Sequence, residues 1–170
     1  EGIREIRGDI VIDRSYFEVS DKDSSGFDEN LYSAYNAMTD AMMFNERVVT
    51  VSVIPKENRV QKKHVDESYK VVDQLEHVNK PCKGKYSWPK VKIDKSEVIP
   101  TVLLKGKISK RCGKRNICKV ITKPYKSFYY ALKDGLRQEG IEVRGHLKLR
   151  KIPLEARGLF THYSDPLEEI

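Results

Sequence analysis

Ser87-Trp88-Pro89-Lys90 has the Ser-x-x-Lys spacing of serine enzymes that catalyse acyl transfer. In such enzymes the Lys amine removes the proton of the Ser hydroxyl, whose oxygen then attacks a carbonyl carbon. This chemistry requires a helix, because residues three positions apart lie on one face of a helix. The secondary structure around these residues therefore decides whether Ser87 is a candidate nucleophile.

The local sequence predicts a turn followed by a strand. Pro89 biases Trp88 toward an extended backbone, and residues 91–95 alternate between apolar and polar side chains as a half-buried strand does. In a strand, positions three apart point to opposite faces. We therefore predict that Ser87 and Lys90 face away from each other and that the Ser-x-x-Lys match is coincidental.

The three cysteines are Cys82, Cys112 and Cys118. Cys112 and Cys118 flank residues 113–117, which are predicted to form a tight loop, so the two thiols could form a disulfide in an oxidising compartment. One cysteine is then left over. A structural zinc site needs four ligands in paired short spacings, and the histidines occur singly, at His64, His77, His146 and His162.

Residues 20–30 are rich in Ser, Asp and Gly and are predicted to form a loop. Asp21, Asp23 and Ser25 alternate as the ligands of a calcium loop do, but no Glu stands at the twelfth position. The sequence therefore predicts no metal site of either kind.

The composition predicts a folded domain. The chain has 170 residues, of which 39% are hydrophobic and 34% charged. No apolar run approaches the roughly 20 residues that span a bilayer, and the first residues have neither a basic start nor an apolar core. We expect no transmembrane or targeting segment. Because the sequence begins without Met, we expect an excised or processed piece.

Charge is unevenly distributed. Residues 1–50 carry a net charge of −6 and residues 51–170 a net charge of +13. Such a basic region could attract an anionic polymer, whether nucleic acid, a membrane surface or cell-wall material, or could simply be the solvated surface of a basic protein. Ten basic residues and no acidic ones lie between Glu97 and Asp134: Lys105, Lys107, Lys110, Arg111, Lys114, Arg115, Lys119, Lys123, Lys126 and Lys133.

One segment predicts a long amphipathic helix. It starts at Pro124, carries apolar residues three and four positions apart and stops at Gly140, so its expected extent is about 125–139. Local propensity also favours a helix over 31–44. Residues 55–85 are polar with short apolar islands and give no clear prediction. Strands are expected at 9–13, 47–54, 90–94, 100–108, 118–123 and 141–152.

The helix, its glycine stop and the strand after it predict a helix packed on a sheet, and hence an α/β or α+β fold. At the carboxyl end, Asp165, Pro166 and Glu168 have the pattern of a helix start with a capping box. Only four residues of that helix are present. We expect its remainder to lie outside this chain.

Five segments together resemble a known family: residues 2–17, 41–53, 102–108, 123–153 and 163–170. They contain Gly-Asp-x-hydrophobic-x-Asp, an Asn-x-hydrophobic strand start, and a helix ending in Gly-Ile-x-Val-x-Gly before Ser-x-Pro-Leu. In order and spacing they resemble the low-molecular-mass class C penicillin-binding proteins, which are periplasmic D-alanyl-D-alanine carboxypeptidases and endopeptidases. The resemblance favours an irregular stretch and then a strand from about Met42, in place of the helix that propensity predicts.

The resemblance implies an α+β fold with two small sheet-containing subdomains, one nested in the other. Residues 1–50 and 114–157 would form the discontinuous second domain and residues 51–113 the nested, mainly β, third domain. Residues 158–170 would return toward a catalytic domain. In the family the catalytic Ser-x-x-Lys lies upstream of such a segment, and Ser-x-Asn and Lys-Thr-Gly lie downstream.

Neither Ser-x-Asn nor Lys-Thr-Gly occurs in this sequence. By the resemblance, the chain therefore holds no catalytic, cofactor-binding or metal-binding residue and should be inactive alone. Its parent would be a serine peptidase of the periplasm that acts on peptidoglycan without metal or nucleotide, through a catalytic domain in cis and with no nucleic-acid partner. The alternative is a basic interaction module that binds an anionic polymer such as nucleic acid through residues 105–133.

Overall fold

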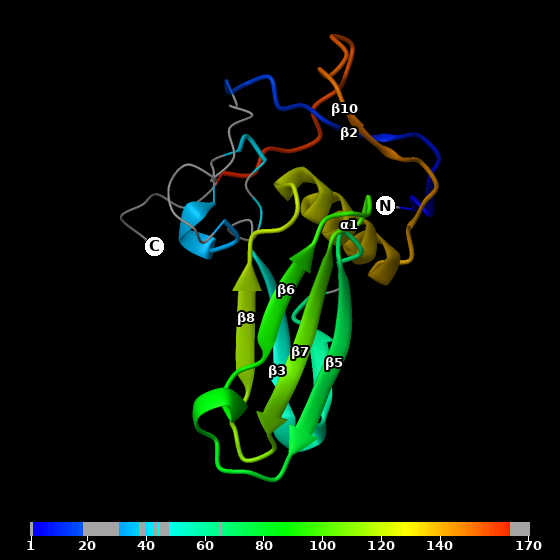
Figure 1. Ribbon diagram of the computed structural model, residues 1–170. Helices are drawn as coiled ribbons and strands as arrows, with labels where there is room; N and C mark the ends of the chain where they lie inside the picture. The colour runs from blue at the N-terminus through cyan, green and yellow to red at the C-terminus, as the bar shows by residue number, and fades with distance from the viewer. Residues whose placement is uncertain are drawn as a thin grey trace.

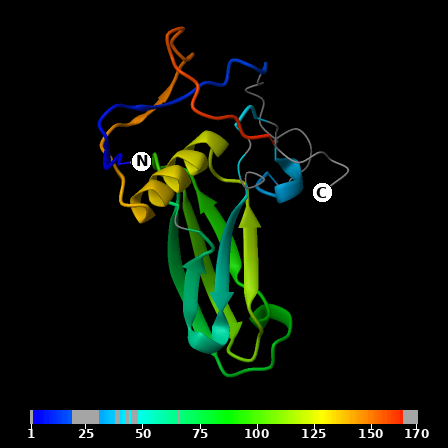
Figure 2. The same cartoon turned by 180° about the vertical axis from the view of Figure 1, so that it is seen from behind.

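The computed structural model describes residues 2–18, 31–37, 40–42, 44, 48–64 and 66–163. These residues form an α+β fold, as predicted, with two three-stranded sheets, two short pairs of parallel strands and one α-helix. The three-stranded sheets lie against each other as two layers, and the helix crosses one end of them (Figures 1 and 2).

The first three-stranded sheet has β3 (Val49–Ile54) at its centre. It pairs antiparallel with β4 (Arg59–Lys62) on one side and with β8 (Arg115–Lys119) on the other. A single 3₁₀ turn, Pro55–Glu57, joins β3 to β4, and Asn58 ends it in the left-handed conformation with φ +50°. Asn tolerates this conformation better than most residues.

The second sheet has the order β5-β7-β6. The central strand is β7 (Thr101–Ser109), which pairs parallel with β5 (Lys70–Val78) over its whole length and antiparallel with β6 (Lys90–Asp94). Parallel neighbours need a long crossover. Here the crossover consists of the loop after β5 and then β6 itself.

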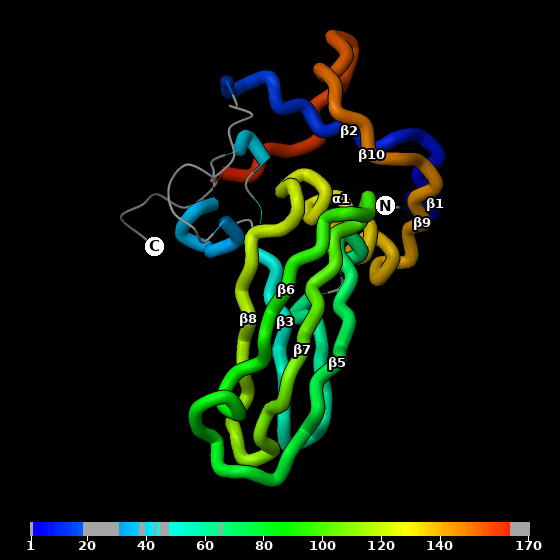
Figure 3. Tube along the Cα trace, viewed as in Figure 1, coloured from blue at the N-terminus to red at the C-terminus, as the bar shows by residue number. Residues whose placement is uncertain are grey.

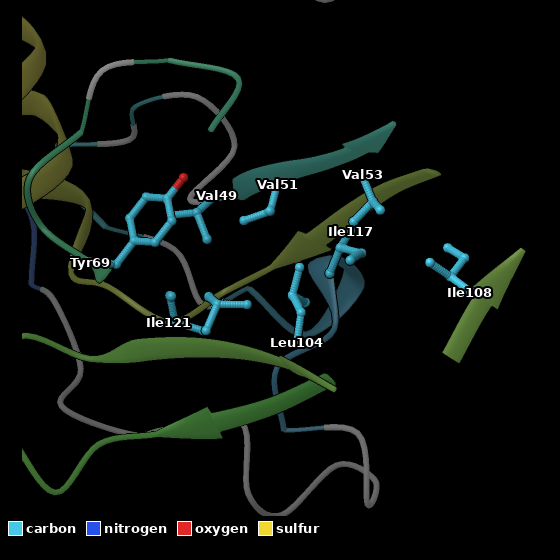
Figure 4. Packing of buried hydrophobic residues seen from close by; sticks show 9 residues of the cluster. Val49, Val51, Val53, Tyr69, Leu104, Ile108, Ile117 and Ile121 are labelled. Carbon is cyan, nitrogen blue, oxygen red and sulfur yellow. The ribbon is translucent and has the colours of Figure 1, made fainter. Parts of the chain in front are cut away.

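One hydrophobic core fills the space between the two sheets (Figure 4). Alternate residues of β3 and β7 point into it, because successive side chains of a strand face opposite sides. Leu104 and Ile108 of β7 are fully buried there. The buried members of the cluster are Val49, Val51, Val53, Tyr69, Val102, Leu104, Ile108, Ile117 and Ile121.

Helix α1 (Pro124–Gln138) has Pro at its first position, and Gly140 follows it with φ +75°. A chain of buried hydroxyl groups ties the helix to the sheets. Ser127 Oγ lies 2.8 Å from Thr122 Oγ1 and 3.3 Å from Ser68 Oγ. Farther along α1, the Tyr129 hydroxyl donates to the carbonyl oxygen of Gly145, at 3.1 Å.

Beyond α1, the two ends of the described chain run side by side (Figure 3). β1 (Glu5–Ile6) pairs parallel with β9 (Glu142–Val143). β2 (Ile10–Ile12) pairs parallel with β10 (Leu147–Leu149). These short ladders fasten the amino-terminal segment to the segment that follows the helix.

The tightest approach in this region involves Gly145. A Cβ added there would lie 1.9 Å from the carbonyl oxygen of Gly8, closer than any real contact. We expect Gly145→Ala to lower the free energy of unfolding by about 1–3 kcal/mol, the usual cost of overpacking. Urea titration measures this change.

Gly135→Ala is the matched control for that substitution. Gly135 is an exposed helix residue, and nothing lies within 4 Å of an added Cβ. Alanine should therefore stabilise the helix there by about 0.5–1 kcal/mol. Equal effects of the two substitutions would contradict the close packing of residues 8 and 145.

The structure confirms most of the predicted elements. The strands expected at 9–13, 47–54, 90–94 and 100–108 and the helix expected at 125–139 are all present within one or two residues of the expected bounds. In place of one strand over 141–152 the structure has the two short strands β9 and β10. The loop expected at 20–30 and the helix start at 165–168 lie outside the described residues.

Three expectations were wrong. The described residues of 31–44 contain a 3₁₀ turn at Ala34–Asn36 and no α-helix, so the helix that propensity favoured is absent and the stretch is irregular, as the resemblance implied. The strand does not start near Met42, since Met42 and Phe44 have no strand pairing and β3 begins at Val49. The strand expected at 118–123 is displaced toward the amino terminus, to 115–119.

Candidate functional site

The structure confirms the predicted turn at Ser87 and the predicted strand that starts at Lys90. Ser87 lies in the turn after the 3₁₀ helix Gly84–Tyr86, and its hydroxyl donates to the carbonyl oxygen of Gly84, at 2.6 Å. Lys90 begins β6, and its aliphatic carbons lie beside Gly106. The Ser87 hydroxyl therefore closes a turn, and the backbone between it and Lys90 is not helical.

Lys62 is the lysine whose pKa the structure lowers, because burial disfavours its charged form. Its amine donates to the carbonyl oxygen of Tyr69, at 2.6 Å, and to that of Asp66, and lies 4.2 Å from the centre of the Tyr69 ring. Lysines with a lowered pKa are candidate bases. Here the amine is engaged by main-chain oxygens, so Lys62 holds the 66–69 turn against β4.

Tyr69 provides a test of this packing at high pH. Burial, assisted by the Asp66 carboxylate, raises the pKa of Tyr69 far above its usual value of 10.0. Stability that depends on the neutral phenol is complete below pH 10 and is lost as the pH rises from there toward the folded-state pKa. We expect the free energy of unfolding to fall above about pH 10 more steeply in the unmodified protein than in Tyr69→Phe.

Phenylalanine keeps the ring beneath Lys62, so Lys62 titrates in both proteins and its effect cancels in the comparison. Urea denaturation at a series of pH values up to about 11 supplies the two curves. Parallel curves would contradict the burial of the Tyr69 hydroxyl.

Two cavities adjoin α1. One of about 540 Å³ lies between the helix and β3, with His64, Asp66 and Asp134 in its wall. The second, of about 260 Å³, shares Asp134 and is lined by further charged residues including Glu67 and Arg137. Asp134 accepts hydrogen bonds from Arg137 and from Gln138 Nε2. Among the described residues of the two walls, no hydrogen bond joins a nucleophile to a base.

The part of the chain that the structure describes contains no ready-made metal site. No group of three or more His, Cys, Asp or Glu side chains is close enough there to hold an ion. Within the same residues, no helix is long and apolar enough to cross a membrane.

The carboxylates of the Gly-Asp-x-hydrophobic-x-Asp motif bind the backbone of the opposite strand. Asp9 accepts from His146 N, at 2.8 Å, and Asp13 accepts from Ile152 N, at 2.9 Å. The bond from Ile152, with further bonds from Ser15, lowers the pKa of Asp13. Sequence spacing marked these two residues but did not indicate their role, which is to join chain segments about 140 residues apart.

Arg14 and Asp40 form a partly buried ion pair that the sequence did not predict. The Nη2–Oδ2 distance is 2.6 Å, and the side chains are 25% and 5% exposed. Arg14 also lies over the ring of Tyr125, 5.2 Å from its centre. The ion pair joins the amino-terminal segment to Asp40, and the contact with the Tyr125 ring joins it to the first turn of α1.

The structure does not contain the Cys112–Cys118 disulfide that the spacing of these residues allowed. The disulfide joins Cys82 to Cys112, with Cα atoms 5.1 Å apart, and Cys118 is free and exposed. Cys112 and Cys118 do not flank a hairpin, because the chain leaves the β5-β7-β6 sheet after Ser109 and enters the other sheet at Arg115. The disulfide therefore joins the loop after β5 to the turn after β7.

The ten basic residues of 105–133 do not form one patch. They are divided between β7, β8, the turn between these strands, and α1 with the residue before it, at the opposite end of the sheets (Figure 1). The turn contributes to a basic region that we call the distal tip, defined as residues 79–89 and 110–115. The distal tip lies at the end of the sheets farthest from α1, beside the β3–β4 turn, whose exposed Glu57 is paired with Arg59.

The fold is similar to parts of known protein structures. It resembles the crystal structure of penicillin-binding protein 4 of Haemophilus influenzae with a TM-score of 0.62, 18% identity, and coverage of 92% of this chain and 34% of that one. A second structure of that protein, complexed with a novel β-lactam, gives a TM-score of 0.54 at 16% identity, with 92% and 32% coverage. The chain thus spans about a third of the length of these structures. No curated protein sequence matches.

The model of one protein family, D-Ala-D-Ala carboxypeptidase 3 (S13), matches residues 1–170. This match confirms the resemblance to low-molecular-mass penicillin-binding proteins that the order of the motifs predicted. The chain belongs to the D-Ala-D-Ala carboxypeptidase 3 (S13) family.

Proposed function

We propose that this chain is the non-catalytic insert region of a serine D-Ala-D-Ala carboxypeptidase or endopeptidase that acts on peptidoglycan. The observation that carries the proposal is the match to the family over all 170 residues of a chain that covers only 34% of a related structure and has no Ser-x-Asn or Lys-Thr-Gly. The position of the Ser87 hydroxyl in a turn supports it. The catalytic residues would lie elsewhere in the parent protein.

The proposed domain division is that of the sequence analysis: 1–50 with 114–157, the nested 51–113, and 158–170 returning to the catalytic domain. The core between the two sheets also includes Val49 and Ile117, which favours slightly wider bounds for the nested part. The pairing of β2 with β10 supports a discontinuous domain made of 1–50 and 114–157, because it brings residues 10–12 beside 147–149. An insert whose two ends lie together can be accommodated within another domain at little conformational cost.

A periplasmic location is part of the proposal. The disulfide between Cys82 and Cys112 supports it, because disulfides persist in oxidising compartments such as the bacterial periplasm. Peptidoglycan would be reached there through the catalytic domain of the parent, and neither metal nor nucleotide would be required.

Hydrolysis of a D-Ala-D-Ala peptide tests the proposal. We expect release of D-alanine by the complete gene product and no release by residues 1–170 at the same molar concentration. A variant of the complete protein that carries Ser87→Ala should retain full activity, because the Ser87 hydroxyl only closes a turn. Loss of D-alanine release in this variant, with folding unchanged, would overturn the assignment of the nucleophile to another part of the protein.

A further inference from the structure

The distal tip has an unusual charge. It contains seven basic residues and no acidic one. Six of the seven are exposed, and no ion pair among the described residues involves any of them. The exposed six are Lys80, Lys83, Lys85, Lys110, Arg111 and Lys114.

An aromatic side chain stands among these charges. Trp88 is 54% exposed at the edge of the tip, although tryptophan is usually well covered. The guanidinium of Arg115, the seventh basic residue, lies 5.2 Å from the centre of its ring. An indole ring combines a large apolar surface with one N–H donor, which suits it to a boundary between water and an apolar phase.

The tip is fixed in shape before any partner binds. The Cys82–Cys112 disulfide joins its two loops, and Arg115 Nε donates to the carbonyl oxygen of Ser87, at 3.1 Å. Arg111 Nε donates to Asn79 Oδ1, at 3.2 Å. A preformed surface loses little conformational entropy on binding, so these charges can act together.

We propose that the distal tip docks on a membrane surface that carries anionic phospholipids. Each Lys or Arg near such a surface is attracted to it, and exposed Trp side chains settle at the level of the lipid headgroups. The tip lies at one end of the two layers of strands, away from α1, so it can meet a membrane end-on (Figures 1 and 2). Both cavities described above lie beside α1, at the other end of the sheets.

The docked orientation has a consequence for the chain ends. β7 has nine residues and spans roughly 30 Å, with the tip at one end and α1 at the other. Residues 2–18 and 142–152 would then face away from the bilayer. If the proposed function holds, the catalytic domain attached there would be directed toward the cell wall; docking itself does not depend on that function.

Trp88 is the only tryptophan of the chain, so its fluorescence reports on the tip directly. We expect the oxidised protein to bind vesicles of which about one third is phosphatidylglycerol, with a blue shift of the Trp88 emission and quenching by brominated lipid. Pure phosphatidylcholine vesicles should not bind. Binding should be lost at about 1 M salt, where the Debye length is about 3 Å.

Two triple variants with the same change in net charge distinguish binding through the distal tip from binding through the positive net charge of the whole protein. Lys83→Glu/Lys85→Glu/Lys114→Glu should weaken partitioning on the order of 100-fold. The control, Lys148→Glu/Arg150→Glu/Arg157→Glu, alters exposed residues remote from the tip and should leave partitioning within a few-fold. Circular dichroism confirms that both variants are folded.

Three results would overturn the proposal: equal weakening by the two variants, vesicle binding without a change in Trp88 emission, or retention of nucleic acid or another soluble polyanion with no binding to vesicles. None of these depends on peptidase activity. Failure of the docking therefore leaves the proposed function untouched, and failure of D-alanine release leaves the docking untouched.

Discussion

Replacing Cys82 and Cys112 together by serine is expected to lower the free energy of unfolding by about 3–4 kcal/mol. The disulfide spans 30 residues, and closing a loop of that size in the unfolded chain accounts for this amount in the chain-entropy model. For a protein of this length the midpoint of thermal unfolding should fall by about 10 °C. Denaturant titration of the oxidised protein and of the double variant measures the difference.

Cys118→Ser is the matched control. Cys118 is exposed and free, and its sulfur lies 3.6 Å from Thr50 Oγ1. Its replacement should change stability by less than about 0.5 kcal/mol. If instead Cys118→Ser destabilised as much as the double variant, the pairing of Cys82 with Cys112 would be wrong. Peptide mapping without reduction would then show which cysteine Cys118 joins.

Leu104→Ala has the second large expected effect, a loss of about 3 kcal/mol. Leu104 is completely buried in the central strand β7, between the two sheets (Figure 4). Truncating a leucine at such a site costs the transfer free energy of the removed carbons and leaves a cavity, since close-packed neighbours relax only in part. Chemical denaturation gives the change in the free energy of unfolding.

Leu154→Ala removes the same atoms from a fully exposed position. It should be neutral within about 0.5 kcal/mol. A cost at Leu154 that equalled the cost at Leu104 would mean that burial between the sheets is not the source of the effect. It would also contradict the face-to-face packing of the two layers.

The sequence predicted those elements whose local pattern agrees with their tertiary surroundings. β6 alternates strictly between half-buried and exposed residues, and Pro124 and Gly140 mark the limits of α1. By contrast, β5 is as long as β7 and was not predicted. It is an edge strand whose Asp73, Gln74 and Glu76 are exposed, so its sequence is mostly polar.

The cysteine pairing shows why short-range spacing was insufficient. Cys112 is six residues from Cys118, but β7 and β8 belong to different sheets, and the chain between the two cysteines crosses from one layer to the other. Cys82 is 30 residues away and lies beside Cys112, because β5 runs parallel to β7 and the two strands end together, at Val78 and Ser109. Long-range strand pairing decided the partner, and no local pattern encodes it.

The sequence was enough to predict that the Ser-x-x-Lys match is coincidental, but it did not predict the polar contacts that hold the loops together. Pro89 and the alternation over residues 91–95 were enough to predict that Ser87 and Lys90 do not share a helix, and the structure has Ser87 in a turn and Lys90 at the start of β6. The ion pair of Arg14 with Asp40 and the engagement of Lys62 by main-chain oxygens depend on which loops meet in space. Neither has a signal in the spacing of residues.

Covalent labelling by a penicillin tests the central claim most directly. Residues 1–170 and the complete gene product are each incubated with a labelled penicillin and analysed by intact mass spectrometry. We predict one added penicillin on the complete protein, attached outside residues 1–170, and an unchanged mass for this chain alone. An added mass on the isolated chain, mapped to Ser87 and abolished by Ser87→Ala, would contradict the account.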